Sequence, residues 1–396
     1  MIILDILILI FLYPLSLAVA WLYLLALIGL IGRKDYPQQS RRYKFLILVP
    51  AHNEAATIGP TLERLNALED RDGSKIVVIA DNCDDDTATV AAGYNVEVLV
   101  RDNPDARGKG YALEWAIGQF ALDDYDAVAI VDADTLVKPD MLRVMTRSFE
   151  TGAGAVQLDY VFYVAEDTPL AQIQAVANRV ENRFFYKPRA IMGLPVLLRG
   201  TGMAIKSDVL VRLPWDSHSI TEDVDYSVKL IQNRVRIDYS VAGEIQAPAT
   251  SSYDQSYTQK LRWASGTFGL IRDRIMPLIG QGLKQGRIDL IELALSFLLL
   301  SRPALIYLTL IPLLLSLAVG GPLGTGYLLW SLFLIGLLVV YLISGVFLVP
   351  QKGKALAALA HVPKFGFWFL KVQLEALFRH RKVGWDRTER KANRHE

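Results

Sequence analysis

The sequence predicts an α/β domain with a mostly parallel sheet, flanked by transmembrane and interfacial helices. Of the 396 residues, 52% are hydrophobic, and the excess lies in two long uncharged stretches near the two ends. Between them, short β-branched runs alternate with helical stretches, which favours parallel strands joined by helices. Polar side chains follow several of these runs, at the strand ends where open α/β sheets bind ligands.

The two uncharged stretches predict membrane spans. No residue is charged from Ile6 to Gly32 or from Pro303 to Gln351, whereas about 20 apolar residues suffice to cross a bilayer. The second stretch is long enough for two spans, with a reversal point at Gly320–Gly326. Buried core helices are the alternative, but they are seldom so long and so free of charge. We expect spans over Leu4–Ile31, Pro303–Val319 and Tyr327–Val349, that is, an anchor within residues 1–32 and a helix pair within 303–349.

The flanking charges predict the orientation of these spans. Basic residues follow the first span and the third, while the Gly320–Gly326 turn carries no charge. Because cytoplasmic loops carry the excess of lysine and arginine, we expect the N-terminus outside and the central domain in the cytoplasm, in an integral protein of the cytoplasmic or plasma membrane. The basic residues are Arg33, Lys34, Arg41, Arg42 and Lys44 after the first span, and Lys352, Lys354, Arg379, Arg381 and Lys382 after the third.

The α/β domain is expected over residues 43–277. Its pattern alternates strand-like runs rich in valine, isoleucine and alanine with helical stretches. The predicted strands are Phe45–Val49, Lys75–Ala80, Val96–Val100 and Ala127–Val131. The predicted helices are Thr57–Leu68, Asp86–Ala92, Gly110–Phe120 and Pro139–Phe149. The strand ends carry His52 and Glu54, Asp81, and the Asp132–Asp134 pair, so we expect these side chains to converge on one crevice.

Two further segments predict helices that lie on the membrane surface. Residues 286–301 are polar at one end and apolar over the rest, and residues 355–378 place lysines among phenylalanines. A fourth span over Ala355–Phe378 is the alternative, although its charges would be costly at bilayer depth. The remainder of 355–396 is a basic tail, either attracted to anionic lipid headgroups or simply solvated.

Overall composition excludes several function classes. Lysine and arginine number 42 against 41 acidic residues, a balance that argues neither for nor against nucleic acid, and no nucleic-acid partner is expected. The lone Cys83 excludes an intrachain disulfide and a cysteine-rich metal site. No P-loop and no dinucleotide-binding glycine motif follows the first strand, so ATPase and dehydrogenase functions lose support. His218 and His361 have no obvious partner in the sequence and are interpreted as structural.

Four elements carry residues suited to group transfer. Asp132 and Asp134 form a D-x-D element behind an apolar strand, where two carboxylates can bind a hard divalent cation. Glu222 and Asp223 precede a helical run, Val224–Gln232, and so can project from its start. Gln259, Arg262 and Trp263 share one face if their segment is helical. Arg199–Gly202 offers a loop of low bulk that a ligand can approach closely, or a plain turn.

Seven short motifs in this region resemble those of family 2 glycosyltransferases, in the same order and at similar spacing. The resemblance is to the membrane-embedded branch that includes cellulose, hyaluronan, chitin-oligosaccharide and poly-N-acetylglucosamine synthases. It implies a GT-A-type nucleotide-sugar transferase fold. The motifs are Val49–Glu54, Ala80–Asn82, Arg107–Gly110, Asp132–Asp134, Arg199–Gly202, Thr221–Asp223 and Gln259–Trp263.

The resemblance implies roles for individual residues. Asp223 is the expected general base, beside Glu222, and Asp134 is the expected main ligand of a Mg²⁺ or Mn²⁺ ion, with Asp132 near the ribose or the metal. Many relatives carry paired aspartates where this chain has Ala80 and Asp81, which loosens the inference about base selectivity. The residues expected to bind the nucleotide sugar are His52, Glu54, Asp81, Lys109, Asp132 and Arg262. Those expected to bind the acceptor are Gly200, Thr201, Gln259 and Trp263.

The activity implied is inverting, metal-dependent transfer from a UDP-sugar to a growing extracellular polysaccharide at the cytoplasmic membrane face. One alternative is the addition of a single sugar to a lipid or lipid-linked acceptor. Another is a catalytically inert scaffold or nucleotide-sugar sensor, which need not keep the aspartate and Gln259–Trp263 motifs. Three spans are fewer than the large synthases use for a conduit, which leaves room for an export partner protein.

Overall fold

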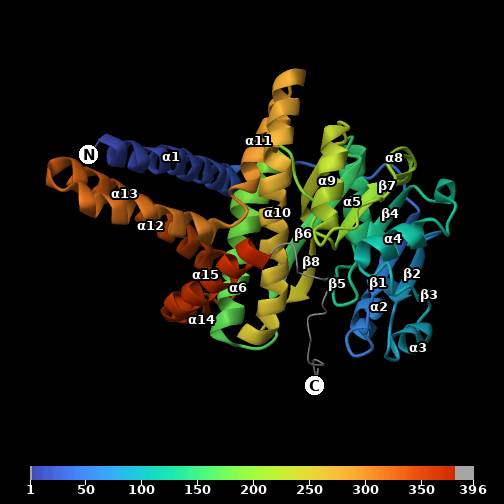
Figure 1. Cartoon of the computed structure of the whole chain (residues 1–396). Helices are drawn as coiled ribbons and strands as arrows, with labels where there is room; N and C mark the ends of the chain where they lie inside the picture. Colours follow the sequence, from blue (N-terminus) through green and yellow to red (C-terminus); the bar gives the residue numbers. More distant parts are fainter. Residues whose placement is uncertain (1, 380–396) are drawn as a thin grey trace.

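The computed structural model describes residues 2–379, and the predicted basic tail beyond Arg379 lies outside this range. An eight-stranded sheet lies at one end of the molecule, and a group of long apolar helices projects from the other (Figure 1). The strands are β1 (Phe45–Ala51), β2 (Lys75–Asp81), β3 (Glu97–Arg101), β4 (Ala127–Ile130), β5 (Leu136–Val137), β6 (Ala155–Tyr163), β7 (Met203–Lys206) and β8 (Ile237–Pro248).

The sheet has the order β3-β2-β1-β4-β7-β6-β8-β5. Strands β3, β2, β1 and β4 are parallel, as predicted, and their boundaries fall within two residues of the predicted ones. Strand β7 is antiparallel to both β4 and β6, β8 runs parallel to β6, and β5 is antiparallel to β8. The sheet is therefore a parallel half joined through β7 to a mixed half.

Helices cover both faces of the sheet, because its central strands are apolar on both sides. Along β1, Leu46 and Leu48 belong to one hydrophobic core, while Phe45, Ile47 and Val49 belong to the other. This alternation follows from the two-residue period of a strand. The helices of the domain are α2 (Ile58–Asn66), α3 (Thr87–Ala92), α4 (Lys109–Ile117), α5 (Met141–Glu150), α6 (Pro169–Glu181), α7 (Lys187–Met192), α8 (Ser207–Arg212) and α9 (Glu222–Gln232).

Three helices of the described chain are long and apolar enough to cross a membrane. They are α1 (Ile2–Ile31), α12 (Arg302–Val319) and α13 (Gly321–Ile343), and the last continues in a short 3-10 turn to Leu348. The end of α1 that carries the N-terminus and the α12–α13 turn lie together, far from the sheet (Figure 1). The prediction that the third span begins at Tyr327 was wrong. Pro322 fits the first turn of a helix, so α13 already begins at Gly321 and Gly320, at φ +67°, makes the reversal.

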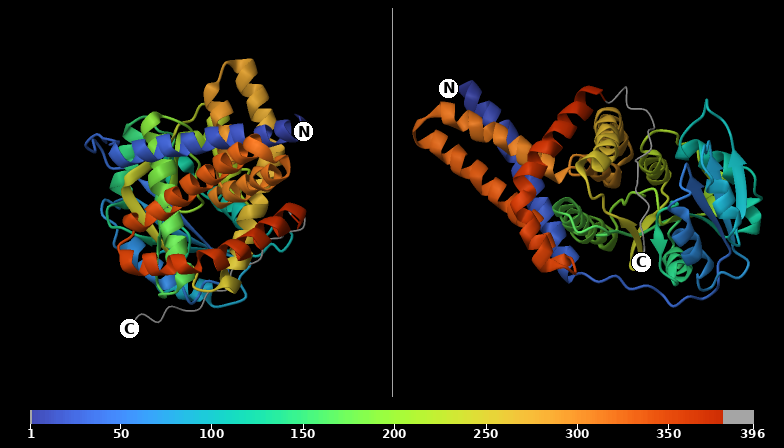
Figure 2. Two further views of the ribbon diagram at one scale, coloured as in Figure 1. Left: turned by 90° about the vertical axis from the view of Figure 1, so that its left-hand side faces the viewer. Right: turned by 90° about the horizontal axis from the view of Figure 1, so that it is seen from below.

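The helices between the sheet and the spans differ from the predicted ones in their extent. Helix α10 (Tyr253–Gln285) runs past the predicted domain end at residue 277, because Pro277 is accommodated within it and Gly286, at φ +63°, ends it. Helix α11 (Ile288–Phe297) folds back along α10. The predicted 355–378 segment is divided between α14 (Lys352–Ala358) and α15 (Val362–Arg379), and neither qualifies as a fourth span. Figure 2 shows α15 beside α10, which agrees with the contacts between them.

Candidate active site

One cavity of about 520 Å³ gathers the residues that the sequence singles out. It lies at the carboxyl ends of the parallel strands and extends to the first residues of α12 and to α13 and α15. Every candidate site residue named above lines it. These residues are His52, Glu54, Asp81, Lys109, Asp132, Asp134, Gly200, Thr201, Glu222, Asp223, Gln259, Arg262 and Trp263.

At the ends of β1 and β2, main-chain contacts hold a histidine and an aspartate side by side. His52 Nδ1 lies 2.7 Å from the Asp81 carbonyl oxygen. Since a carbonyl can only accept, Nδ1 donates. The Asp81 carboxylate accepts a hydrogen bond of 2.5 Å from Arg101, and both side chains are nearly buried. The sequence did not predict Arg101, which comes from the end of the neighbouring strand β3.

At the end of β4, a lysine neutralises the first aspartate of the D-x-D element. The ammonium of Lys109, at the start of α4, forms an ion pair with Asp132 and donates a hydrogen bond of 2.8 Å to the Gly200 carbonyl. Burial alone would lower the pKa of Lys109, but Asp132 and Glu222 raise it overall, so the lysine stays charged. The Asp132 main-chain N–H donates to Thr201 Oγ1 over 2.9 Å. This contact joins β4 to the glycine loop.

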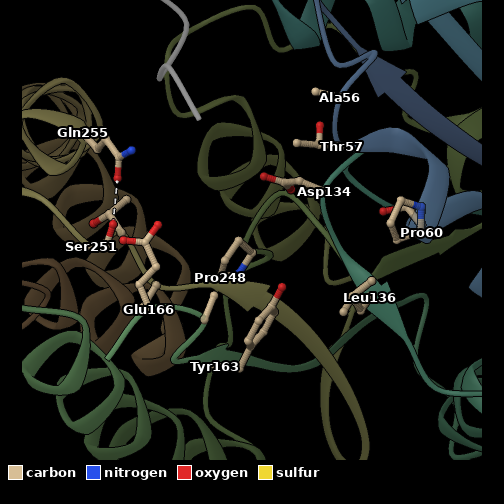
Figure 3. Close-up of a pocket in the computed structure, with 14 residues that line it drawn as sticks. Ala56, Thr57, Pro60, Asp134, Leu136, Tyr163, Glu166, Pro248, Ser251 and Gln255 are labelled. Carbon is tan, nitrogen blue, oxygen red and sulfur yellow. Dashed lines mark hydrogen bonds between the residues drawn. The ribbon is translucent and has the colours of Figure 1, made fainter. Parts of the chain in front are cut away.

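Asp134 belongs to two adjoining cavities. Besides the large one, it lines a smaller cavity of about 90 Å³ between α2 and the start of α10. Figure 3 shows Asp134 with Thr57 on one side and Glu166 and Gln255 on the other.

Two carboxylates at this strand end fit a hard divalent cation, since Mg²⁺ and Mn²⁺ prefer oxygen ligands. Within residues 2–379 no group of three metal-ligating side chains is present. Asp134 and Asp132 would therefore hold the ion together with oxygen atoms of a ligand or of water.

The start of α9 carries two adjacent carboxyl groups, of which Glu222 is buried and Asp223 is half-buried. Burial raises the pKa of Glu222, and the charge of Asp223 raises it further. Burial also raises the pKa of Asp223, against the opposing effect of Lys109. Asp223 accepts a hydrogen bond of 2.8 Å from the Val224 N–H, at the helix N-terminus. An aspartate whose pKa is raised toward neutrality is suited to accept a proton.

The Arg199–Gly202 loop passes directly beside this carboxylate. Gly200 has a φ of +79°, and a Cβ added there would lie 3.4 Å from both Asp223 Oδ2 and Lys109 Nζ. The positive φ favours glycine at this position, and an added Cβ would be in contact with both side chains.

Helix α10 places the Gln259–Trp263 motif along the wall of the cavity. Gln259 is buried, whereas Trp263 is 37% exposed. The helical conformation puts Gln259, Arg262 and Trp263 on one side, as the spacing predicted. Lys260 Nζ lies 4.3 Å from the centre of the Trp263 ring. The sequence analysis assigned no role to Lys260, nor to Glu181 and Arg302, which also line the cavity.

Comparisons with protein families, with curated proteins and with solved structures bear on this architecture. The family model described as "Glycosyltransferase like family 2" matches residues 42–266, more than half of the chain. A poly-beta-1,6-N-acetyl-D-glucosamine synthase of Staphylococcus aureus is 28% identical over 224 residues, which are 55% of this chain and 53% of that protein. The chain thus spans about half the length of this relative.

Two further similarities extend over more of the chain. A probable glycosyltransferase of Sulfolobus acidocaldarius is 24% identical over 359 residues, which cover 85% of this chain and 74% of that protein. Among solved structures, the mannosyltransferase PcManGT of Pyrobaculum calidifontis, in complex with GDP-Man and Mn²⁺, superposes with a TM-score of 0.61. It is 17% identical, and the match covers 90% of this chain and 98% of that one. This last similarity supports the fold and its helical extension.

Proposed function

The chain belongs to glycosyltransferase family 2, and from this premise we propose that it moves a sugar from a UDP-sugar to a saccharide acceptor at a membrane surface, with inversion at the anomeric carbon. The proposed acceptor is a growing extracellular polysaccharide, and the proposed membrane face is the cytoplasmic one. The observation that carries the proposal is the cavity itself. Asp134 and Asp223 both line it, together with every other candidate residue.

The strand-end side of the cavity is the proposed donor site. Asp81, held by Arg101, and His52, held by the Asp81 carbonyl, form a fixed polar wall for the uracil and ribose. Lys109 and Arg262 supply positive charge for the diphosphate. Asp134 and Asp132 are the proposed ligands of Mg²⁺ or Mn²⁺, which when bound offsets the charge that develops on departing UDP. The Mn²⁺ found with PcManGT is consistent with this assignment.

Asp223 is the proposed general base. It takes the proton of the acceptor hydroxyl while that oxygen bonds to the anomeric carbon and the bond to the UDP oxygen breaks with its electron pair. Attack from the face opposite UDP inverts the configuration. Its partial burial favours this role, because the raised pKa makes the carboxylate a stronger base. Lys109, charged and hydrogen-bonded to Gly200, fixes the loop next to the base.

The acceptor side is proposed to face the membrane. Gly200, Thr201, Gln259 and Trp263 would hold the terminal sugar, with Trp263 offering a flat apolar surface. The cavity continues to Leu342 on α13 and to Phe365 on α15. This continuation favours the second candidate function, transfer to a lipid or lipid-linked acceptor. We propose that the N-terminus lies outside and the transferase domain lies in the cytoplasm. The proposed division is an anchor (1–32), the transferase domain (43–277), an interfacial helix (286–301), two spans (303–349) and an interfacial helix with a basic tail (355–396). Because α10 continues to Gln285, the end of the transferase domain moves to that residue. An export partner protein remains part of the proposal.

The test is nucleotide release by the purified full-length protein in detergent, with a panel of UDP-sugars and GDP-sugars and with Mg²⁺ or Mn²⁺. We expect one UDP-sugar to be turned over and Asp223→Asn to reduce kcat by about 100-fold or more. Asp225→Asn is the matched control, because Asp225 lies on the same helix but pairs with Arg274 outside the cavity.

Two results would contradict the proposal. If Asp223→Asn released UDP as fast as the wild type, the base would be misassigned. If no nucleotide sugar were turned over while the protein remained folded, the inert scaffold would be the better account. Analysis of the product separates the two acceptor classes, since a ladder of lengths indicates a polysaccharide and one added sugar indicates single transfer.

A further inference from the structure

The membrane-side end of the cavity carries charged side chains for which the sugar-transfer step has no evident use. We define the cationic cluster as Glu181, Arg199, Lys260 and Arg302, all of which line the cavity. We propose that this cluster binds the phosphate or pyrophosphate group of a lipid-linked acceptor. The inference rests on the second candidate function, transfer to a lipid or lipid-linked acceptor, and names the group of that acceptor that the site binds.

The cluster has an excess of positive charge. Glu181, at the end of α6, accepts hydrogen bonds of 3.1 Å from Arg199 and 3.0 Å from Arg302. Burial alone would raise the pKa of Glu181, but these arginines lower it, so the carboxylate stays charged. Three cations thus surround one anion. The nearby carboxylates of Asp159 and Glu244 pair with Arg179, at 3.8 and 3.4 Å, and the charge of Arg199 also acts on Asp159.

Lys260 is the member of the cluster with the fewest polar partners. In the part of the chain that the structure describes, its ammonium contacts only aromatic rings, those of Trp263 at 4.3 Å and Phe162 at 5.9 Å. Burial and the charge of Arg199 lower its pKa to about 8, although Glu181 opposes this effect. Lys260 is half-buried, and the one carboxylate whose charge favours its ammonium, Glu181, is shared with Arg199 and Arg302. A bound anion would balance the remaining positive charge of the cluster and give this ammonium a hydrogen-bonding partner.

Arg199 has donors left for the same anion. It uses hydrogen bonds to Asn182 (2.6 Å) and Glu181, whereas a guanidinium has five N–H groups. Its plane packs over the rings of Tyr160 and Tyr186, at 5.3 and 4.8 Å, which fixes its orientation. Asn182 begins a π-helical turn that interrupts the path from α6 to α7, a distortion often found at functional sites.

The position of the cluster assigns the anion to the acceptor rather than to the donor. Arg199 is adjacent in sequence to Gly200, where an added Cβ would lie 3.4 Å from Asp223 Oδ2, while the proposed donor residues His52 and Asp81 lie at the ends of β1 and β2. Lys260 and Arg262 are two positions apart on α10, and helix positions at this spacing do not face each other. They are thus suited to two different anionic groups.

An apolar wall beyond the cluster indicates that the anion carries a lipid. Leu300, Pro303, Leu342, Phe365 and Phe369 line the cavity next to the charged side chains. They come from the end of the α11 segment, the two predicted spans α12 and α13, and α15. A hydrocarbon chain leaving the cluster would pass along this wall toward the membrane helices, whereas a free phosphate or a neutral glycan would leave it unused.

The proposal is tested by direct binding to the full-length protein in detergent, with saturating UDP present to fill the donor end. The probes are a short-chain polyprenyl phosphate, the polyprenol of the same length and inorganic phosphate. We expect the polyprenyl phosphate to bind the most tightly. We expect Lys260→Met to weaken its binding by about tenfold or more, and Lys260→Arg, which keeps the charge, to restore most of it. Lys284→Met, an exposed lysine on the same helix, is the matched control and should bind like the wild type.

Three outcomes would overturn the inference: equal binding of polyprenol and polyprenyl phosphate, unchanged phosphate binding in Lys260→Met, or inorganic phosphate binding as tightly as the lipid. The wild-type comparison of the probes does not depend on any variant, and UDP binding checks that the variants are folded. Failure of the proposed function is a separate observation, the absence of sugar transfer from any donor. These binding measurements do not require turnover.

Discussion

The donor and acceptor sides of the cavity are built in different ways. On the proposed donor side, His52, Asp81 and Asp132 lie at the ends of parallel strands, and two of these side chains are paired, Asp81 with Arg101 and Asp132 with Lys109. On the proposed acceptor side, side chains from α6, α10, α12 and α15 meet across long stretches of sequence, and three cations share the Glu181 carboxylate. This difference indicates that the protein itself balances the charges of the donor side, whereas on the acceptor side we propose that a ligand does so.

Removal of the proposed metal ion from the donor side is expected to have the largest effect on sugar transfer. We expect chelation with EDTA, or the substitution Asp134→Asn, to reduce sugar transfer by about 1000-fold, since charge stabilisation by a metal is worth several kcal/mol. Readdition of Mn²⁺ should restore the chelated wild type but not Asp134→Asn. The control is Asp140→Asn, which alters an aspartate a few residues further on that lines neither cavity. Full activity in EDTA would show that sugar transfer does not require a divalent cation.

The buried Asp81–Arg101 pair tests whether the donor side is preorganised. Arg101→Met would leave the nearly buried Asp81 carboxylate without its counter-ion, so we expect a loss of about 3 kcal/mol in the free energy of unfolding. Lys75→Met breaks the Lys75–Glu97 pair between the same two strands, but that pair is exposed and should matter by less than about 1 kcal/mol. Chemical denaturation of both variants measures the difference. Equal losses would mean that burial does not distinguish the two pairs.

Gly200 lies at the boundary between the two sides. Gly200→Ala should lower kcat by about tenfold, because its Cβ would crowd both Asp223 and Lys109. Gly193→Ala has a similar positive φ but no atom within 4 Å of the added Cβ, so it carries the same backbone strain without the crowding. Steady-state kinetics of the two variants isolate the contact. A similar kcat in both would show that the close approach has no catalytic role.

The pH dependence of the Glu222–Asp223 pair gives the smallest expected effect, and activity and stability should change in opposite directions. Burial raises the pKa of both groups above their values in the unfolded chain. Transfer needs ionised Asp223, so activity should fall as the pH drops through its raised pKa, well above the ordinary aspartate value of about 3.9. The folded protein binds more protons than the unfolded chain in the same window, so stability should rise there as the pH falls.

Paired measurements of kcat and of the unfolding midpoint across this pH window check the prediction. In Asp223→Asn the contribution of this residue to the pH dependence of stability should vanish. An acid limb at the ordinary aspartate value in the wild type would mean that burial does not perturb the base.

The residues of the donor side could be predicted from the sequence because they lie next to strands that are recognisable in the sequence. Apolar strands are recognisable by composition, and His52, Asp81 and Asp132 follow them directly, so the sheet topology brings them together. The spacing of Gln259, Arg262 and Trp263 likewise predicted that they share one face of a helix. The parallel half of the sheet and the family were therefore predicted correctly.

The strands and site residues that were not predicted depend on contacts between distant segments of the chain. Arg101 is chosen as the partner of Asp81 by strand pairing, and nothing near it in the sequence marks it. Strands β6 and β8 went unrecognised because their pairing joins residues far apart in the chain. Glu181 and Arg302 are 121 residues apart, so their ion pair is visible only in the fold. The one available signal was Lys260, a cation within an already recognised motif.

The central claim is that one cavity holds the donor sugar on one side of Asp223 and the acceptor on the other. The most direct measurement is an electron cryo-microscopy structure of the full-length chain with Mn²⁺ and a non-hydrolysable UDP-sugar. We expect the uracil beside His52 and Asp81, the diphosphate beside Asp134, and the anomeric carbon facing Asp223. A nucleotide bound outside this cavity, or a sugar turned away from Asp223, would contradict it.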